Sequence, residues 1–305
     1  MKAALAPLLL LLLLTAAACA PVTPAIEKAA TPVQPNNAMF GTDAQLAPSA
    51  PDAILRYADH ARGFAELRLP AGEGPFPLAV IYHGGCWKTG IASQAYMAPL
   101  ATRWQQLGIA TLNVDYREVG DGGGWPGSFE DWAASARLID EVAARYPIDR
   151  DAVTLVGHSA GGLPAQWLAS AQGQHGPIGP RAPLKARAAI VLDGPGDVGA
   201  ERGAFDALCQ FSAVDPFMGA APDAVPGRYA AIASAAAAPQ LSALLFVQAK
   251  LSAPSAATLA ALGAGGATVT VRENVGVSHF AIITPGAPAY EANEPAMLAV
   301  LKGEE

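Results

Sequence analysis

The fold is decided by residues 153–162, which read Val153-Thr154-Leu155-Val156-Gly157-His158-Ser159-Ala160-Gly161-Gly162. The first four residues form a continuous apolar run typical of a buried strand, and a helical pattern begins directly after the glycines. Between them lies Gly157-x-Ser159-x-Gly161, the nucleophile-elbow pattern, whose tight turn requires small residues beside the serine. Such a turn places the hydroxyl above a sheet edge at a helix N-terminus, where the helix dipole favours developing negative charge. The stretch therefore predicts that Ser159 is a nucleophile.

A second glycine-rich motif, His83-Gly84-Gly85-Cys86-Trp87, follows the apolar run Leu78–Tyr82. Glycines at the end of a strand let backbone N–H groups point at a bound oxyanion, which side chains would otherwise block. The motif matches the HGGG-type oxyanion loop of esterases, with cysteine in place of the third glycine. We expect the amides of Gly84, Gly85 and Ala160 to stabilise a tetrahedral oxyanion. The histidine of the motif is expected to hold the loop by hydrogen bonding rather than to act as a base.

The rest of the chain alternates strand-like and helix-like patterns. Two short alternating runs, Ile54–Tyr57 and Ala65–Leu69, predict an antiparallel opening pair. Continuous apolar runs suit strands buried on both faces of a parallel sheet, and they occur at 78–82, 109–114, 153–156, 188–192, 244–247 and 268–271. Helical patterns lie between them, at about 93–107, 128–145, 160–172, 254–263 and 287–302. This alternation predicts an α/β fold with a mostly parallel central sheet flanked by helices.

Composition suggests where the folded domain begins and where it is interrupted. Residues 19–52 are rich in proline and alanine and show little periodicity, which is typical of a linker. Residues 53–305 carry the alternating patterns and are expected to form one α/β domain. Within it, residues 195–240 are rich in Ala, Gly and Pro and break the alternation. We expect this segment to be a small lid-like insertion.

The N-terminus carries a targeting pattern. Lys2 supplies a positive charge, Leu8–Leu14 forms an apolar region, and small residues precede Cys19. Residues 1–18 are therefore predicted to be a secretory signal peptide that is cleaved before Cys19. A cysteine at the first mature position resembles a bacterial lipoprotein signal, in which the thiol receives diacylglycerol. We expect an exported protein, periplasmic or at the cell surface, that is anchored to a bacterial membrane through lipidated Cys19; secretion without lipidation is the alternative.

Overall composition excludes several classes of protein. Of the 305 residues, 52% are hydrophobic and 15% are charged, whereas average chains are nearer a quarter charged. Beyond the N-terminal run, no stretch of about 18 apolar residues could form a membrane-spanning helix. A net charge of −7 without a basic cluster argues against nucleic acid as a partner. The sequence has no metal-ligand or nucleotide-binding motif, so we expect no cofactor, and it indicates no protein partner.

On the two glycine-rich motifs, the chain resembles the α/β-hydrolase family. The similar branch has hormone-sensitive-lipase-like, kynurenine-formamidase-like and acetylxylan/feruloyl-esterase-like members, and the HGG-x-W form resembles the last two in particular. Further similarity lies in Tyr57–His60 and in Asn113–Arg117. The resemblance runs from about residue 53 to the end and is densest between 78 and 170. It implies an α/β-hydrolase fold and catalytic residues in the order serine, acid, histidine.

The base that this resemblance implies must follow Ser159, which leaves His175 and His279. His175 lies in a loop rich in glycine and proline soon after the helix that follows the serine, and a solvated loop residue is the simpler interpretation. His279 falls just beyond the last predicted strand, where family members carry the catalytic histidine. We therefore expect His279 to be the base.

The acid departs from the family pattern. Family members usually place an aspartate after the strand that is Leu244–Val247 here, but residues 248–255 contain no carboxylate. An acid is expected because it holds the imidazole in the correct tautomer and stabilises the imidazolium. Asp193, at the end of the preceding strand, is the first candidate. Asp197, Glu273 and the absence of any acid remain open at this stage.

Together these features predict a serine carboxylesterase that cleaves a small-molecule ester through an acyl-enzyme intermediate. The sequence does not define the acyl chain length. The missing acid in the 248–255 loop motivates one alternative, a catalytically degenerate surface lipoprotein with a binding role. The HGG-x-W form motivates another, an arylformamidase-like amidohydrolase. Cys86 and Cys209 could also pair in an oxidising compartment, which would tie the lid to the oxyanion loop.

Overall fold

The computed structural model describes residue 1 and residues 46–180, 184–233 and 241–304, and within these ranges the apolar runs form eight strands. The strands are β1 (Ala53–Arg56), β2 (Phe64–Arg68), β3 (Phe76–Tyr82), β4 (Ala110–Val114), β5 (Ile148–His158), β6 (Ala188–Leu192), β7 (Ala243–Gln248) and β8 (Thr268–Glu273). They pair in one sheet in the order β1-β2-β4-β3-β5-β6-β7-β8. β2 is antiparallel to both β1 and β4, and the other pairs are parallel. The predicted mostly parallel α/β fold is confirmed.

Each predicted helical segment contains a helix in the structure, although two of the segments are divided. The segment 128–145 becomes two helices that meet at Ala136, and the segment 160–172 changes helix between Trp167 and Ala171. The α-helices of the described ranges are α1 (Ala98–Gln106), α2 (Gly127–Ser135), α3 (Arg137–Arg145), α4 (Gly162–Trp167), α5 (Ala171–His175), α6 (Arg202–Cys209), α7 (Val214–Met218), α8 (Pro226–Ala230), α9 (Ala256–Gly263) and α10 (Pro288–Lys302). Short 3-10 turns are η2 (Gln94–Met97), η3 (Ser159–Gly161) and η5 (Ala281–Ile283).

Local sequence explains several helix ends. The Ser255 side chain accepts the backbone N–H of Thr258 and so begins α9. α10 has a proline in its first turn, where no intrahelical hydrogen bond is lost. The same helix ends at Gly303, which adopts a φ of +73° that a residue with a Cβ disfavours. None of the helices in the described part of the chain is long and apolar enough to cross a membrane.

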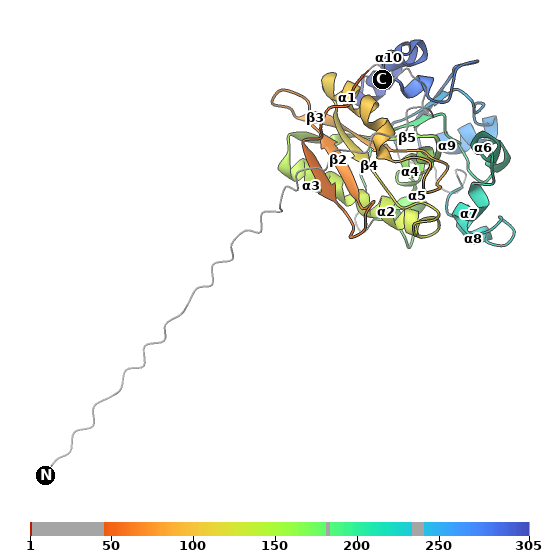
Figure 1. Cartoon of the computed structure of the whole chain (residues 1–305), viewed down its shortest axis with the longest axis horizontal. Coiled ribbons are helices and arrows are strands. Elements are labelled where there is room, and N and C mark those ends of the chain that lie inside the picture. The colour runs from red at the N-terminus through yellow and green to blue at the C-terminus, as the bar shows by residue number, and fades with distance from the viewer. Residues whose placement is uncertain (2–45, 181–183, 234–240, 305) are drawn as a thin grey trace.

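The sheet separates two apolar cores, because successive side chains of a strand point to opposite faces. In β3, Leu78, Val80 and Tyr82 belong to one core, whereas Ala79 and Ile81 belong to the other. Residues of α1 and α10 complete the second core, and residues of α2, α3 and α4 complete the first (Figure 1). The continuous apolar runs of the sequence are explained by this two-sided burial.

One strand differs from the prediction. The run Thr268–Val271 was expected to be buried on both faces, but β8 lies at the edge of the sheet and pairs with β7 on one side only. Its residues alternate between exposed and half-buried. The alternation of threonine and valine in this run fits an edge strand, because only one face needs to be apolar.

The segment between β6 and β7 contains α6, α7 and α8, which lie in the interval predicted as a lid-like insertion. Of that interval, residues 234–240 lie outside the described residues, as do residues 2–18 of the predicted signal peptide, Cys19 and most of the predicted linker. The described domain begins earlier than residue 53. The amide of Ser49 donates to Thr102 Oγ1 at 2.9 Å, and the Ser49 hydroxyl donates to Gln105 Oε1 at 2.7 Å, so this residue packs on α1.

Candidate active site

Ser159 lies on a sharp turn between β5 and α4. Its φ is +54°, a left-handed conformation that is strained for a residue with a Cβ, and the residue is only 3% exposed. A Cβ on Gly157 would lie 1.8 Å from the carbonyl oxygen of Gly161, and one on Gly161 would lie 2.1 Å from that of Tyr82. Both positions therefore require glycine, because the turn packs backbone directly against backbone. This is the strand, turn and helix that the sequence predicts around the serine.

His279 contacts one of the candidate acids. Its Nδ1 lies 2.6 Å from Oδ2 of Asp193, whose side chain is fully buried, whereas the His279 side chain is 15% exposed. Asp197 accepts the amide of Ala200. Glu273 accepts that of Ala253, in the loop after β7. His175 lies at the exposed end of α5. The structure thus brings Asp193, and not the other candidate acids, to His279.

The loop after β7 holds Asp193 although it contains no carboxylate of its own. Oδ1 of Asp193 accepts the amides of Ala249, Lys250 and Leu251 at 2.8, 3.0 and 2.9 Å, and Oδ2 accepts that of Lys250 at 2.8 Å. Burial opposes ionisation, but these bonds and the bond from His279 hold the pKa of Asp193 below its ordinary value. An ionised carboxylate therefore faces Nδ1 of His279, which favours the tautomer whose basic nitrogen is Nε2.

The His279 loop lies beside the turn that carries Ser159. The rings of His279 and His158 have their centroids 4.4 Å apart, and Nε2 of His158 lies 3.1 Å from the backbone oxygen of His279. Ser159 and Asp193 follow the carboxyl ends of the parallel strands β5 and β6, and His279 lies in the loop that follows β8. In open α/β sheets, ligands bind outside these strand ends. His279 and Asp193 are in contact there, and Ser159 lies on the neighbouring turn.

The glycine-rich loop after β3 passes over the serine. A Cβ on Gly84 would lie 2.8 Å from Cβ of Ser159. The amide of Gly84, however, donates to the hydroxyl of Tyr96. The expectation that Gly84 donates to an oxyanion is therefore wrong for this arrangement, because its proton is already engaged. The next residue, Gly85, has a φ of +114°, which side-chain-bearing residues rarely adopt.

Other amides near the serine are candidates to serve an oxyanion. Within the described residues, no acceptor binds the amides of Gly85 and Cys86. Ala160 follows the serine in the first turn of η3, where backbone N–H groups lack intrahelical partners. Two of the three predicted donors, Gly85 and Ala160, thus remain candidates, and Cys86 takes the place of Gly84.

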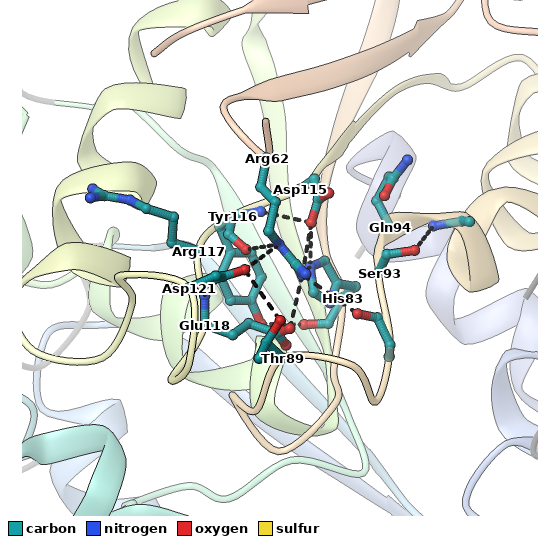
Figure 2. A network of polar contacts seen from close by, with 12 residues as sticks. Arg62, His83, Thr89, Ser93, Gln94, Asp115, Tyr116, Arg117, Glu118 and Asp121 are labelled. Atoms are coloured by element: carbon teal, nitrogen blue, oxygen red, sulfur yellow. Dashed lines mark hydrogen bonds and ion pairs between the residues drawn. The ribbon is translucent and has the colours of Figure 1, made fainter. Parts of the chain in front are cut away.

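His83 holds this loop in the way the sequence predicts (Figure 2). Its Nδ1 lies 2.6 Å from the carbonyl oxygen of Gly84, and its Nε2 lies 3.1 Å from Oδ1 of Asp115. The Arg62 guanidinium lies between two carboxyl groups, 3.1 Å from Asp115 and 2.9 Å from Glu118. The loop therefore rests on a polar network that joins the end of β3 to the segment after β4.

Glu118 is a fully buried member of this network. Its Oε1 would lie 3.2 Å from a Cβ on Gly85, so the carboxyl group packs directly against the oxyanion loop. Arg62 attracts it, but Arg62 is shared with Asp115 and Asp121. Burial outweighs this attraction and raises the pKa of Glu118 to about 9. The raised pKa favours the protonated carboxyl group at pH 7.

The inserted segment is attached to the oxyanion loop. Cys86 and Cys209 form a disulfide with their Cα atoms 6.0 Å apart, which links the loop to the last residue of α6. The neighbouring ring of Trp87 stacks on Phe217 of α7 with centroids 4.4 Å apart. Two consecutive residues of the oxyanion loop thus contact α6 and α7, so this part of the insertion stabilises the position of the loop.

Two residues of the site belong to no motif and were missed by the sequence analysis. Tyr96 of η2 bonds to Gly84 and also lies 2.8 Å from Nδ1 of His158. Arg62 reaches the carboxyl groups behind the loop from the turn between β1 and β2. A single tyrosine or arginine outside a pattern carries no sequence signal, so these contacts become visible only in three dimensions.

Part of the chain is similar to a known protein family. Residues 66–199 match the BD-FAE family model, a span that includes the oxyanion loop, Ser159 and Asp193 but ends before His279. Comparison of the sequence with curated proteins gives no match.

Several solved structures are similar in fold. Esterase B from Lactobacillus rhamnosis, inhibited by a tributyrin phosphonate, has a TM-score of 0.64 and 19% sequence identity over 84% of this chain and 89% of that one. Esterase Est2 from Thermogutta terrifontis, with propionate bound, has a TM-score of 0.61 and 18% identity over 82% and 93%. A truncated carbohydrate esterase from gut microbiota has a TM-score of 0.61 and 16% identity over 86% and 99%.

Proposed function

We propose that this chain, which belongs to the α/β-hydrolase family and carries the BD-FAE esterase region in residues 66–199, hydrolyses carboxylic esters through a covalent acyl-enzyme. The single observation that carries the mechanism is the 2.6 Å contact between Nδ1 of His279 and the carboxylate of Asp193. This contact supports Asp193 as the orienting acid; the lack of a carboxylate in the 248–255 loop had motivated the alternative of a non-catalytic role.

The proposed reaction begins at Ser159. His279 accepts the hydroxyl proton through Nε2 as the serine oxygen attacks the ester carbonyl, and Asp193 stabilises the imidazolium that forms. The amides of Gly85, Cys86 and Ala160 then stabilise the oxyanion of the tetrahedral intermediate.

Collapse of this intermediate completes acylation. The imidazolium gives its proton to the leaving alcohol, which leaves the acyl group on the serine oxygen. In the second half, His279 takes a proton from water as the water attacks the acyl-enzyme, and the carboxylic acid is released as the serine regains its proton.

Small esters are the proposed substrates. The similar structures include an esterase inhibited by a tributyrin phosphonate and one with propionate bound, and another neighbour is described as a carbohydrate esterase. The candidate nucleophile is almost fully buried, whereas the His279 side chain reaches solvent. This burial favours a short acyl group at the serine and an alcohol portion that extends outward, as in an acetyl decoration of a polysaccharide.

The test is hydrolysis of p-nitrophenyl acetate and p-nitrophenyl butyrate by the purified protein and by Ser159→Ala. Ser242→Ala is the matched control, because this exposed serine donates to the backbone oxygen of Arg187 and belongs to no part of the candidate site. We expect turnover by the wild type and by Ser242→Ala, and a loss of about 10⁴-fold or more in Ser159→Ala. Absence of turnover by folded wild-type protein, or retention of turnover in Ser159→Ala, would contradict the proposal.

We also propose that the protein acts outside the cytoplasm, anchored by lipid on Cys19. The N-terminal pattern of residues 1–19 supports this location. A disulfide between Cys86 and Cys209 fits it, since structural disulfides persist mainly in oxidising compartments. Such a location would suit an enzyme that removes ester groups from external polymers.

A further inference from the structure

A chain of hydrogen bonds joins the oxyanion loop to the loop that carries His279. The amide of Gly84 donates to the hydroxyl of Tyr96, and this hydroxyl lies 2.8 Å from Nδ1 of His158. Nε2 of His158 in turn lies 3.1 Å from the backbone oxygen of His279. The chain begins in the loop after β3, passes through η2 and the end of β5, and ends in the loop after β8. It therefore runs beside Ser159, which is the next residue after His158.

The direction of each hydrogen bond follows from the acceptor at the His279 end of the series and from the neutral state of the His158 imidazole. The carbonyl oxygen of His279 can only accept, so Nε2 of His158 must carry a proton. Burial and the nearby His279 ring hold the pKa of His158 well below its ordinary value, although Asp193 acts in the opposite direction, so the imidazole is neutral with one N–H. Its Nδ1 is then an acceptor for the Tyr96 O–H, and the Tyr96 oxygen accepts the amide of Gly84.

We propose that Tyr96 and His158 are positioning residues for the ester hydrolysis proposed above, and that their hydrogen bonds keep the oxyanion loop and the His279 loop aligned with Ser159. The kinetic part of this inference rests on the proposed function, whereas the bond directions rest on the contacts and on the neutral state of the His158 imidazole.

The contacts show how each residue would act. A Cβ placed on Gly84 would lie 2.8 Å from both the Tyr96 hydroxyl and Cβ of Ser159, so the hydroxyl restrains the backbone that covers the nucleophile. The bond from His158 restrains the main chain of His279, whose ring must reach the serine during the reaction. A displacement of about 1 Å in such a group can reduce the rate about 100-fold. Both residues thus act through their neighbours.

The variant Tyr96→Phe tests the kinetic role. It removes the hydroxyl and keeps the ring, which lies edge-on to His158 and Phe280. The matched control is Tyr82→Phe, which removes another buried hydroxyl, one that bonds to Ser135 in the core. We expect kcat for p-nitrophenyl acetate to fall about 10- to 100-fold in Tyr96→Phe, with KM within about twofold of wild type. The control should keep the wild-type kcat.

A kcat for Tyr96→Phe equal to that of the control would overturn the positioning role, provided that the wild type is active. An inactive wild type would instead contradict the proposed function, so the two failures are distinguishable.

A second measurement needs no turnover and no variant that must fold. In ¹⁵N NMR of the wild-type imidazoles, we expect His158 to show a protonated Nε2 and an unprotonated Nδ1 across the neutral pH range. Its ring faces the titratable groups of Tyr96, His279 and, further away, Asp193. A protonated Nδ1, or a doubly protonated ring at neutral pH, would overturn the proposed direction of the chain.

Discussion

Removal of the Cys86–Cys209 disulfide should lower both stability and turnover. The two cysteines are 123 residues apart in the sequence, so the bond closes a long loop in the unfolded chain. Chain entropy alone then corresponds to about 5 kcal/mol of stabilisation. For a domain of about 250 residues, this is a shift in Tm of about 10–20 °C. The value is an upper limit, since residual structure in the unfolded chain reduces it.

The effect on turnover follows from the position of the bond. Cys86 lies in the oxyanion loop beside Gly85, and without the disulfide the loop is attached to the insertion by non-covalent contacts such as those of Trp87 with Phe217 and Phe205. An aromatic contact of this kind contributes about 1 kcal/mol beyond burial, far less than the covalent bond. We therefore expect a looser oxyanion loop and a decrease in kcat of about tenfold.

The assay compares thermal unfolding and p-nitrophenyl acetate hydrolysis with and without dithiothreitol, for the wild type and for Cys209→Ala. The variant should behave like the reduced wild type, and the reductant should not change it further. A Tm of the reduced protein within about 2 °C of that of the oxidised protein corresponds to less than about 1 kcal/mol. If kcat is also unchanged, the disulfide to the inserted segment does not hold the oxyanion loop in place.

Three further expectations concern the acid, a buried carboxyl group and the N-terminus. Asp193→Asn should lower kcat by about 10⁴-fold, because an amide does not hold His279 in the required tautomer, and steady-state kinetics checks this. Glu118 has a raised pKa of about 9, so the folded state binds a proton that the unfolded state loses above about pH 4.5, and this group makes stability fall as pH rises between these values. Glu118→Gln should remove that slope in urea unfolding measured from pH 5 to pH 9; an unchanged slope would mean that Glu118 is ionised. Cys19 should incorporate labelled palmitate in a bacterial host, and Cys19→Ser should not. Absence of label in the wild type would contradict lipidation and favour secretion without it.

The fold and the nucleophile could be predicted from the sequence because the patterns that indicate them are contiguous in the chain. The strand, the turn and the helix around Ser159 are contiguous, and close backbone packing requires Gly157 and Gly161 at fixed spacing. The buried strands were visible for a similar reason, since side chains on both faces of β5 and its neighbours must be apolar. β8 was predicted to be buried on both faces because its threonines were counted as part of a continuous apolar run, although the alternation of threonine and valine fits an edge strand.

The acid that contacts His279 could be predicted only in part from the sequence. Few carboxyl groups follow Ser159, which narrowed the candidates, but Asp193 and His279 are 86 residues apart and their contact is a property of the tertiary structure. The amides of the loop after β7 stabilise Asp193, and backbone groups leave no trace in the sequence. For the same reason the bond between Gly84 and Tyr96, which removes one predicted oxyanion donor, could not be foreseen.

The central claim is that Ser159 is a nucleophile activated by His279, and covalent labelling tests it most directly. The purified protein is treated with a fluorophosphonate, and the adduct is located by peptide mass spectrometry. The account predicts one adduct on Ser159, no adduct in Ser159→Ala, and much slower labelling in His279→Ala than in the exposed-histidine control His175→Ala. Folded wild-type protein that remains unlabelled, or that is labelled at a different residue, would contradict it.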